Sequence, residues 1–247
     1  MRVLGIIPAR YASVRLPGKP LERIGDVSLI MRVYTQVKKA RLVSDVIVAT
    51  DDERIFNHVR EEGGQAVMTS VDHRTGTERC FEACKKLEKN FDFVINIQGD
   101  EPFVHPEQLD SLISSLNNST EVATMCKRIE NLDELMDPNL PKLILDDLYR
   151  AIYFSRAPIP YIREHAFDKW LDYGTFFKHI GIYAYRSDIL ATIVKLKPSI
   201  TEMMEQLEQL RWISNGVKIN VVETNLESIS VDTFEDLQKA RMYHDKN

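Results

Sequence analysis

The sequence predicts an α/β fold whose first half forms a doubly wound, mostly parallel sheet. Short apolar runs rich in β-branched residues alternate there with longer stretches of helical periodicity, which is the rhythm of successive strand and helix units. The run Phe93 to Ile97 is apolar at nearly every position, as a parallel strand covered on both faces must be. Beyond Glu121 the alternation becomes irregular, so we expect several strands of the second half to pair antiparallel.

The first half is expected to contain four strands and three helices. The apolar runs predict strands at Val3 to Ile7, Val46 to Ala49, Ala66 to Met68 and Phe93 to Ile97. Helical periodicity predicts helices at Leu29 to Ala40, Asp52 to Glu62 and Thr75 to Leu87. The pair Gly63-Gly64 ends the second helix, because glycine readily takes the left-handed conformation found after helix C-termini.

The second half is expected to contain five strands and two helices. The strands are expected at Val122 to Cys126, Lys142 to Leu145, Ala151 to Phe154, Ile180 to Tyr185 and Lys218 to Val222, and the helices at Asp188 to Val194 and Thr201 to Ile213. Prolines exclude a central strand or helix at Arg156 to Tyr161, and the segment Arg163 to Lys178 lacks a clear period, which predicts a long loop or lid. Without a repeat or a flexible linker, we expect residues 1–247 to form a single domain.

The composition is that of a globular protein and excludes a disordered chain. The 247 residues include 32 basic and 37 acidic side chains, giving a net charge of −5, and 44% of the residues are hydrophobic. The chain has no block of basic residues that would favour nucleic acid or a membrane surface as a partner, and no apolar stretch long enough to span a bilayer. The mildly acidic balance favours small molecules as ligands, and three cysteines with the absence of a signal-peptide pattern predict a cytoplasmic protein.

The segment after the first expected strand, Pro8 to Pro20, gathers three cationic side chains and a hydroxyl. Arg10, Arg15 and Lys19 share this proline-flanked loop with Ser13, ahead of the first expected helix. The loop has neither the Walker pattern nor the dinucleotide glycine fingerprint. Its cations and backbone N–H groups nevertheless suit a polyphosphate. The alternative is an exposed loop whose charges are simply solvated.

A carboxylate follows the fourth expected strand, where Gly99 precedes Asp100. Ligands of open parallel sheets bind at the carboxyl ends of the strands, so we expect Asp100 to lie near the cationic loop. A carboxylate beside phosphate oxygens suits Mg²⁺. Asp232, ahead of the last expected helix, can supply a second carboxylate, although its position alone is more typical of a helix N-cap. For the segment Gly99 to Pro102, a plain surface turn is the alternative.

Three further clusters place polar side chains where a ligand could meet them. The segment Asp72 to Arg79 offers guanidinium groups and hydroxyls at a helix start, or else a capping sequence with solvated arginines. The strand around Ile180 places four residues on one face: His179, Gly181, Tyr183 and Tyr185. A lone histidine in a strand is more often structural than functional. The helix expected after Thr201 carries side chains typical of a solvated face: Glu205, Glu208, Gln209 and Arg211.

Together these segments closely resemble the 3-deoxy-manno-octulosonate cytidylyltransferases, which activate the sugar acid Kdo with CTP. The resemblance covers nearly the whole chain, through the segments Ile7–Ser13, Arg15–Leu21, Ala49–Asp51, His73–Arg79, Gln98–Pro102, Tyr153–Arg156, His179–Arg186, Leu207–Arg211 and Val231–Thr233. The segments at Ile7 and Gln98 are shared more widely among sugar nucleotidyltransferases. The combination with those at His179 and Leu207 is much narrower.

The resemblance implies a nucleotide-diphospho-sugar transferase-like fold that binds CTP and Mg²⁺. The nucleotide would be held by Pro8, Ala9, Arg10, Ser13, Arg15, Lys19, Arg74, Thr75, Gly76 and Gln98. The metal would be held by Asp100 and Asp232, and the catalytic residues would be these two with Arg10 and Lys19.

The resemblance also implies that the irregular second half serves sugar binding and homodimer formation. Kdo would be met by Arg79, Gln98, His179, Tyr183, Glu208 and Gln209. Its anomeric hydroxyl would attack the α-phosphorus of CTP in line, giving CMP-Kdo and pyrophosphate. Two alternatives stay open: a cytidylyltransferase for another acidic sugar, such as 8-amino-Kdo or a sialic acid, and a non-catalytic nucleotide-binding regulator.

Overall fold

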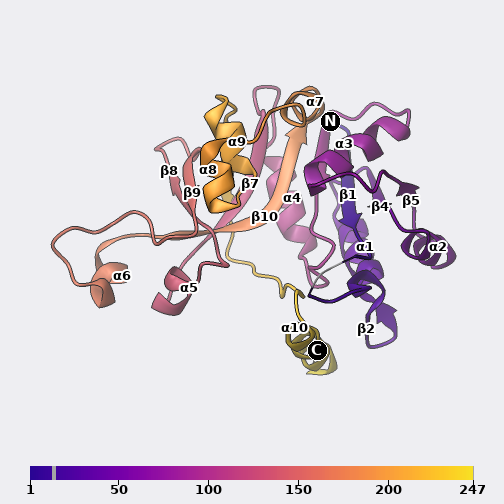
Figure 1. Cartoon of the computed structure of the whole chain (residues 1–247), viewed down its shortest axis with the longest axis horizontal. Coiled ribbons are helices and arrows are strands. Elements are labelled where there is room, and N and C mark those ends of the chain that lie inside the picture. Colours follow the sequence, from indigo (N-terminus) through magenta and orange to yellow (C-terminus); the bar gives the residue numbers. More distant parts are fainter. Residues whose placement is uncertain (13–14, 247) are drawn as a thin grey trace. The chain divides into compact units, whose positions relative to one another are not determined.

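Residues 1–12 and 15–246 are described by a computed structural model, in which the chain forms two units. Unit 1 contains Met1–Ser114 and the segment from Glu227 onward, and unit 2 contains Ser115–Leu226 (Figure 1). Strands and helices alternate in unit 1, and the predicted α/β class is confirmed. Whether the two units behave as a single domain stays a prediction.

The sheet of unit 1 is parallel, as predicted. Its strands are β1 (Val3–Ala9), β4 (Asp45–Thr50), β5 (Ala66–Met68) and β6 (Phe93–Asn96). They run in the order β6-β1-β4-β5, with β1 paired to β6 on one side and β4 on the other. Every residue of β6 is buried, because helices cover both faces. A two-stranded hairpin, β2 (Arg23–Ile24) with β3 (Val27–Ser28), stands apart from this sheet.

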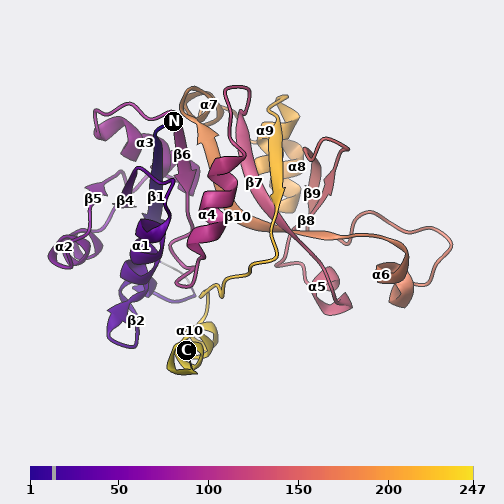
Figure 2. The same cartoon turned by 180° about the vertical axis from the view of Figure 1, so that it is seen from behind.

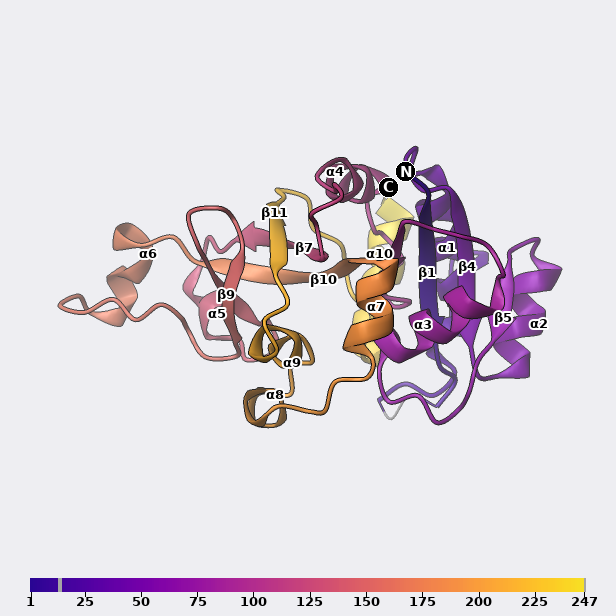
Figure 3. The same cartoon turned by 90° about the horizontal axis from the view of Figure 1, so that it is seen from above.

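The helices of unit 1 form two layers around the sheet. They are the short η1 (Lys19–Leu21), then α1 (Leu29–Lys39), α2 (Glu53–Glu61), α3 (Gly76–Lys86), α4 (Pro106–Ser114) and α10 (Phe234–Lys246). Seen from above, α3 and α4 lie on opposite sides of β1 (Figure 3). The first three predicted helices are confirmed with ends within one residue. The helix α4 is absent from the sequence predictions.

Unit 2 is mainly antiparallel, which confirms the expectation for the second half. Its strands are β7 (Val122–Arg128), β8 (Lys142–Leu145), β9 (Ala151–Ser155), β10 (Phe177–Arg186) and β11 (Ile219–Glu223). The long β10 pairs antiparallel with both β7 and β8, and β8 pairs antiparallel with β9. Only β11, which Figure 2 shows beside β7, is parallel to its neighbour among the described pairings of this unit.

The predicted helix from Thr201 to Ile213 is wrong, because the chain forms two short helices there. These are α8 (Ile200–Glu205) and α9 (Gln209–Ser214), and the break lies at Gln206, whose φ is 53°. Arg156 holds the break from outside, since its Nε donates to the carbonyl of Glu205 at 2.7 Å. Neither glycine nor proline marks this position, so the sequence carries no local signal for it.

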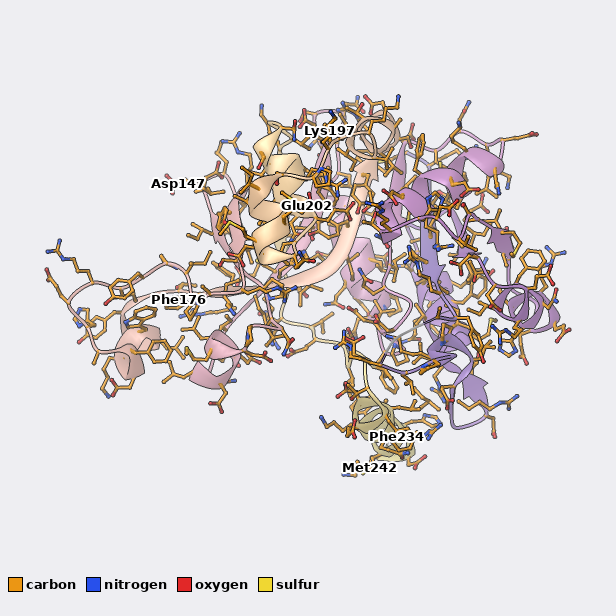
Figure 4. All side chains as sticks on the ribbon, in the orientation of Figure 1. Asp147, Phe176, Lys197, Glu202, Phe234 and Met242 are labelled. Carbon is orange, nitrogen blue, oxygen red and sulfur yellow. The ribbon has the colours of Figure 1, made fainter. Side chains whose placement is uncertain are left out.

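The predicted loop or lid from Arg163 to Lys178 is also wrong in part. The segment contains η2 (Phe167–Lys169), α6 (Trp170–Tyr173) and the first residues of β10. Trp170 and Phe176, the latter labelled in Figure 4, are buried with Ile129 and Leu135 in a small apolar core. This core, which α5 (Leu132–Met136) helps to form, fixes the segment to the rest of unit 2. A further helix of unit 2, α7 (Ser187–Ile193), lies between β10 and α8.

No helix in the described ranges has both the length and the apolar character that a bilayer crossing requires.

Candidate active site

A pocket of about 230 Å³ lies at the carboxyl ends of β1 and β6, where the sequence places the nucleotide. Its lining comprises Pro8, Ala9, Arg10, Ala12, Lys19, Pro20, Gln98, Gly99 and Asp100. The structure therefore brings the two segments predicted to share a site, the cationic loop and the turn after β6, to one place. Ser13, also predicted to bind the nucleotide, lies outside the described residues.

The carboxylates of Asp100 and Asp232 converge on a single cation, the ammonium group of Lys19. The Lys19 Nζ lies 2.8 Å from Asp100 Oδ2 and 3.0 Å from Asp232 Oδ1. A second cation reaches the same cluster, since a terminal nitrogen of Arg15 lies 3.3 Å from Asp232 Oδ2. Four residues predicted to act on the nucleotide or the metal thus contact one another directly, although their roles stay predictions.

Backbone contacts place these carboxylates side by side. The N–H of Val231 donates to the carbonyl of Asp100 at 2.8 Å, which joins the segment before α10 to the end of β6. Gly99 is required at this point, because a Cβ there would lie 2.7 Å from the carbonyl oxygen of Pro8. The turn after β6 therefore packs directly against the end of β1.

The interpretation of Asp232 as a helix N-cap is wrong, because Thr233 caps α10. The N–H of Asp236 donates to Thr233 Oγ1 at 3.2 Å, and Asp236 Oδ2 accepts the N–H of Thr233 at 3.1 Å. Phe234 then opens the helix (Figure 4). With the cap supplied by its neighbour, the Asp232 carboxylate turns to Lys19 instead.

Burial makes the negative charges of this cluster costly unless a cation lies close by. It raises the pKa of Asp100, although Lys19 opposes the shift. Burial would lower the pKa of Lys19, but the Asp100 and Asp232 carboxylates outweigh it and the pKa is raised. Burial also raises the pKa of Glu101 to about 7, even though Ser228 Oγ donates to its carboxylate at 2.7 Å. A cation close to these carboxylates is therefore stabilising.

Arg79 is held by other residues of unit 1. Its side chain is 1% exposed, and one terminal nitrogen donates to Asp51 Oδ2 at 2.7 Å while the other donates to the Thr69 hydroxyl. Arg10 lies in the field of this pair, because burial and the charge of Arg79 lower the pKa of Arg10 while Asp51 raises it. Arg79 thus anchors Asp51 beside the pocket, and its predicted contact with the sugar stays a prediction.

The loop before α3 is tied to that helix by two glutamates one turn apart. Glu78 and Thr75 form a capping box, which confirms the capping sequence in the alternative, but Arg79 of this segment is buried and not solvated. Glu82 Oε2 accepts the N–H of Ser70 at 2.9 Å and contacts His73 Nε2. These contacts fix the backbone on either side of Arg74, and the predicted nucleotide contacts of Arg74, Thr75 and Gly76 stay predictions.

In unit 2, three of the residues predicted for one face of a strand form an aromatic cluster. The ring of Tyr183 lies 5.1 Å from that of His179 and 5.9 Å from that of Tyr185, measured between centroids. The ladder between β10 and β7 shifts register between Ile180 and Tyr183, which bends the strand at this point. The shared face of His179, Tyr183 and Tyr185 is confirmed.

His179 is uncharged and its tautomer follows from its partner. Burial lowers the pKa of His179 to about 3. The Thr124 hydroxyl donates to the carbonyl of Ile182 at 2.7 Å, so it accepts from His179 Nε2 at 2.9 Å. The imidazole therefore carries its proton on Nε2 and presents Nδ1 as a hydrogen-bond acceptor.

Tyr183 presents a buried hydroxyl that has no hydrogen-bond partner among residues 1–12 and 15–246. Its side chain is 7% exposed, and burial, followed by the nearby Tyr185 and Glu208, raises the pKa of Tyr183 well above its ordinary value. A buried hydroxyl without a partner is destabilising, so a ligand or a water molecule that bonds to it would be favoured.

The break between α8 and α9 places Glu208 directly before α9, half-buried, and Gln209 in its buried first turn. The expectation of a solvated face is wrong. Arg211 is buried too, and its Nε donates to Glu202 Oε2 at 2.8 Å, which binds the two short helices together. Figure 4 labels Glu202 on α8.

The sequence predictions missed three residues that hold the site: Glu82, Thr124 and Ser228. Glu82 follows Glu78 by one helical turn, and this spacing could have indicated two carboxylates on one helix face. Thr124 and Ser228 contact residues 55 and 127 positions away, and no local signal announces such partners. Within the described residues, no cluster of three or more His, Cys, Asp or Glu side chains is arranged to hold a metal ion.

Comparison with known proteins shows the family to which the chain belongs. Residues 4–219 match the cytidylyltransferase family. A relative from Cytophaga hutchinsonii named 3-deoxy-manno-octulosonate cytidylyltransferase is 52% identical over 236 residues, which cover 95% of this chain and 94% of the relative. One of the same name from Parabacteroides distasonis is 49% identical and covers 97% of each chain.

Solved structures agree with the sequence relatives. The structure of CMP:2-keto-3-deoxy-manno-octonic acid synthetase complexed with CTP has a TM-score of 0.93 at 38% identity, covering 100% of this chain and 99% of that one. A 4-diphosphocytidyl-2C-methyl-D-erythritol synthase from Anaerococcus prevotii has a TM-score of 0.64 at 16% identity, covers 99% of this chain and 96% of that one, and shares the fold alone.

The fold, the pocket at the strand ends and the family match define a cytidylyltransferase. Within that class, the chain belongs to the family of 3-deoxy-manno-octulosonate cytidylyltransferases.

Proposed function

We propose that this protein transfers CMP from CTP to the anomeric hydroxyl of Kdo, giving CMP-Kdo and pyrophosphate. The names of relatives at 52% and 49% identity support Kdo, and the CTP bound in the similar solved structure supports the nucleotide. The observation that carries the proposal is the pocket at the ends of β1 and β6, where cationic and acidic side chains meet.

A Mg²⁺ ion fits the residues at this pocket. Asp100 and Asp232 already direct one oxygen each at a common cation, and this ion usually takes one or two carboxylates and completes its shell with phosphate oxygens and water. When bound, the ion would neutralise phosphate charge and acidify the attacking hydroxyl. Holding it would be the task of these two carboxylates.

The other residues of unit 1 would bind and align the triphosphate. Arg10, Arg15 and Lys19 supply positive charge for the phosphate oxygens, which carry the charge that develops as pyrophosphate leaves. Pro8, Ala9 and Gln98 line the same pocket and would limit how the nucleotide lies. The chain forms no covalent bond to substrate in this proposal, and its contribution is alignment and charge stabilisation.

The second unit would supply hydrogen-bonding groups to the sugar acid, and two of them, His179 and Tyr183, are neutral. His179 Nδ1 can accept from a sugar hydroxyl, and the Tyr183 hydroxyl can donate to a sugar oxygen. Glu208 and Gln209 would add further acceptors and donors. Groups that only hydrogen-bond discriminate strongly among sugars, because a wrong sugar leaves buried partners unpaired.

We also propose that the protein is a homodimer formed through unit 2. The turn and strand at β9 and the helix α8 expose large apolar side chains: Leu148, Tyr149, Ile152, Ile200, Met203 and Met204. The two elements are bonded to each other through Ser155 and Glu205, at 2.6 Å. Exposed apolar groups of this kind mark interaction surfaces. The cytoplasmic location stays a prediction.

Pyrophosphate release tests the proposal. The purified protein should release pyrophosphate with CTP, Mg²⁺ and Kdo, and much more slowly with ATP, GTP or UTP. Replacing Kdo by 8-amino-Kdo or a sialic acid tests the rival sugars, and turnover that is faster with either would replace Kdo in the proposal. No release with any acid would favour the non-catalytic regulator.

A further inference from the structure

We propose that Lys19 is an internal counter-ion that holds the divalent-cation position between Asp100 and Asp232 until the metal binds. Metal binding would then release Lys19 into the nucleotide pocket, so that the two ligands bind cooperatively. This inference rests on the proposed function, because it takes from it the assignment of the two carboxylates as metal ligands.

The position of the ammonium group carries the inference. Lys19 Nζ lies 2.8 Å from Asp100 Oδ2 and 3.0 Å from Asp232 Oδ1, so two of its three N–H donors meet carboxylate oxygens. The side chain is only 13% exposed. An ammonium group bonded to two carboxylates and largely shielded from water resembles a bound cation more than a free phosphate ligand.

The ammonium group and a divalent ion cannot share this position. Mg²⁺ and Mn²⁺ bind carboxylate oxygens at about 2.0–2.2 Å, closer than the Lys19 nitrogen lies to either oxygen. An ion bound to both oxygens would occupy the space of the ammonium group and repel its charge. The metal must therefore replace Lys19 rather than join it.

The released side chain has a place to go. Lys19 lines the same pocket as Arg10 and Gln98, where the triphosphate would bind. With both carboxylates neutralised by a divalent ion, the Lys19 charge becomes available for phosphate oxygens. Linkage then requires that metal and nucleotide raise each other's affinity.

Arg15 provides a matched comparison. It also contacts Asp232, at 3.3 Å, but through the other carboxylate oxygen, Oδ2, and its side chain is 64% exposed. Exposed ion pairs contribute little, so removing this one should barely change metal affinity.

The test is the affinity of the nucleotide-free protein for Mn²⁺, measured by electron paramagnetic resonance. Lys19→Met should tighten Mn²⁺ binding about tenfold or more, because the ion no longer displaces a charged hydrogen-bonding partner. Lys19→Arg, which keeps the charge, should bind Mn²⁺ about as weakly as the unaltered protein. Arg15→Gln should change the affinity by less than about twofold. Asp100→Asn should abolish the site in every background.

A thermal melt guards against a variant that is merely misfolded. Without metal, Lys19→Met should melt lower than the unaltered protein, because two close carboxylates lose their cation. Mn²⁺ should raise its melting temperature more than that of the unaltered protein.

The possible outcomes separate this inference from the proposed function. If Lys19→Met leaves Mn²⁺ binding unchanged or weaker while Asp100→Asn still abolishes it, Lys19 does not hold the metal position and the proposed function stands. If no variant binds Mn²⁺ in a way that depends on Asp100, the metal assignment fails, and the role of Lys19 fails with it.

Discussion

In unit 1 the charged candidate residues are already paired with one another, whereas in unit 2 His179 and Tyr183 are neutral groups in a buried aromatic cluster. Lys19 is bonded to two carboxylates, and Arg79 to Asp51. His179 is neutral, and the Tyr183 hydroxyl lacks a partner among the described residues. The first arrangement must exchange partners when a charged substrate binds. The second has only to accept a ligand.

Because of this difference, the two substrates meet different free-energy costs when they bind. Paired ions are stable without ligand, because each buried charge has a partner, but ligands must compete with those partners. Neutral groups need no counter-ion and keep their orientation, at the cost of an unsatisfied hydroxyl. Substitutions of the paired ions Lys19, Asp100 and Asp232 should therefore change metal and nucleotide steps, and those of His179 and Tyr183 should change the sugar step.

The largest expected effect tests the paired ions of unit 1. Asp100→Ala should lower the rate of pyrophosphate release by at least about 10³-fold, because it removes one of the two oxygens that would hold the metal. CTP binding measured by calorimetry without metal should survive, since no phosphate contact is lost. As a control, Asp188→Ala removes an exposed ion pair with Arg186 and should keep near-normal turnover. Near-normal turnover of Asp100→Ala itself would remove this carboxylate from the mechanism.

Tyr183→Phe tests the neutral groups of unit 2, His179 and Tyr183. Its KM for Kdo should rise about three- to tenfold, the range of a lost neutral hydrogen bond, while its KM for CTP stays the same. Its melting temperature should not fall, because the hydroxyl bonds to nothing else in the described chain. Tyr185→Phe, a stacking neighbour on the same strand, is the matched control and should leave both KM values unchanged. A lower melting temperature with unchanged KM for Kdo would make Tyr183 a structural residue.

A smaller effect is expected where unit 1 uses a carboxylate to position backbone. Glu82→Ala should raise the KM for CTP about three- to fivefold with little change in the KM for Kdo, because the loop before α3 loses its contacts through Ser70 and His73. Burial opposes ionisation, but hydrogen bonds from Lys86, Ser70 and His73 lower the pKa of Glu82 to about 2, so the effect should not vary between pH 6 and 9.

Lys86→Ala is the control for this positioning role. Lys86 bonds to the other oxygen of Glu82, at 2.7 Å, on the exposed side of α3. Its removal also costs a hydrogen bond to the carbonyl of Met68, at 2.8 Å, but it leaves the contacts of Glu82 with Ser70 and His73 in place. The KM for CTP should therefore stay within about twofold. Equal effects of the two substitutions would show that the stability of α3, and not the position of the loop, sets the KM.

The two halves also differ in how much of them the sequence predicts. In unit 1, β5 has the predicted ends, because an apolar run bounded by polar residues defines a short strand locally. The place of Gly99 and Asp100 in the site can also be predicted, because ligands of parallel sheets bind at the carboxyl ends of the strands. The pairing of Asp232 with Lys19 cannot be predicted from the sequence in this way. It depends on Thr233 capping α10 in place of Asp232, and on a lysine that lies 213 positions away.

In unit 2 the residues alone favour the structural interpretation, and only the resemblance indicates a site. On local pattern Glu208 lies on a solvated helix face, and the break at Gln206 that changes its surroundings is held by Arg156, which directly follows β9. The neutral state of His179 depends on burial, and its tautomer depends on Thr124 in a neighbouring strand. Both are tertiary effects that override local pattern.

The smallest expected effect tests that neutral state through stability. The pKa of His179 is about 3 in the folded protein and about 6.5 when unfolded, so below pH 6.5 the unfolded chain gains a proton that the folded protein does not bind. Stability should therefore fall as the pH drops from 7.5 to 5, by about 1–2 kcal/mol from this group. In His179→Gln the drop in melting temperature over this interval should be smaller by about 2–6 °C, measured by differential scanning fluorimetry. His165→Gln, which removes an exposed imidazole stacked on Tyr173, serves as the control. If His179→Gln loses as much stability in acid as the unaltered protein, the imidazole is not held neutral, and the contrast between an ionic and a neutral half fails at its central residue.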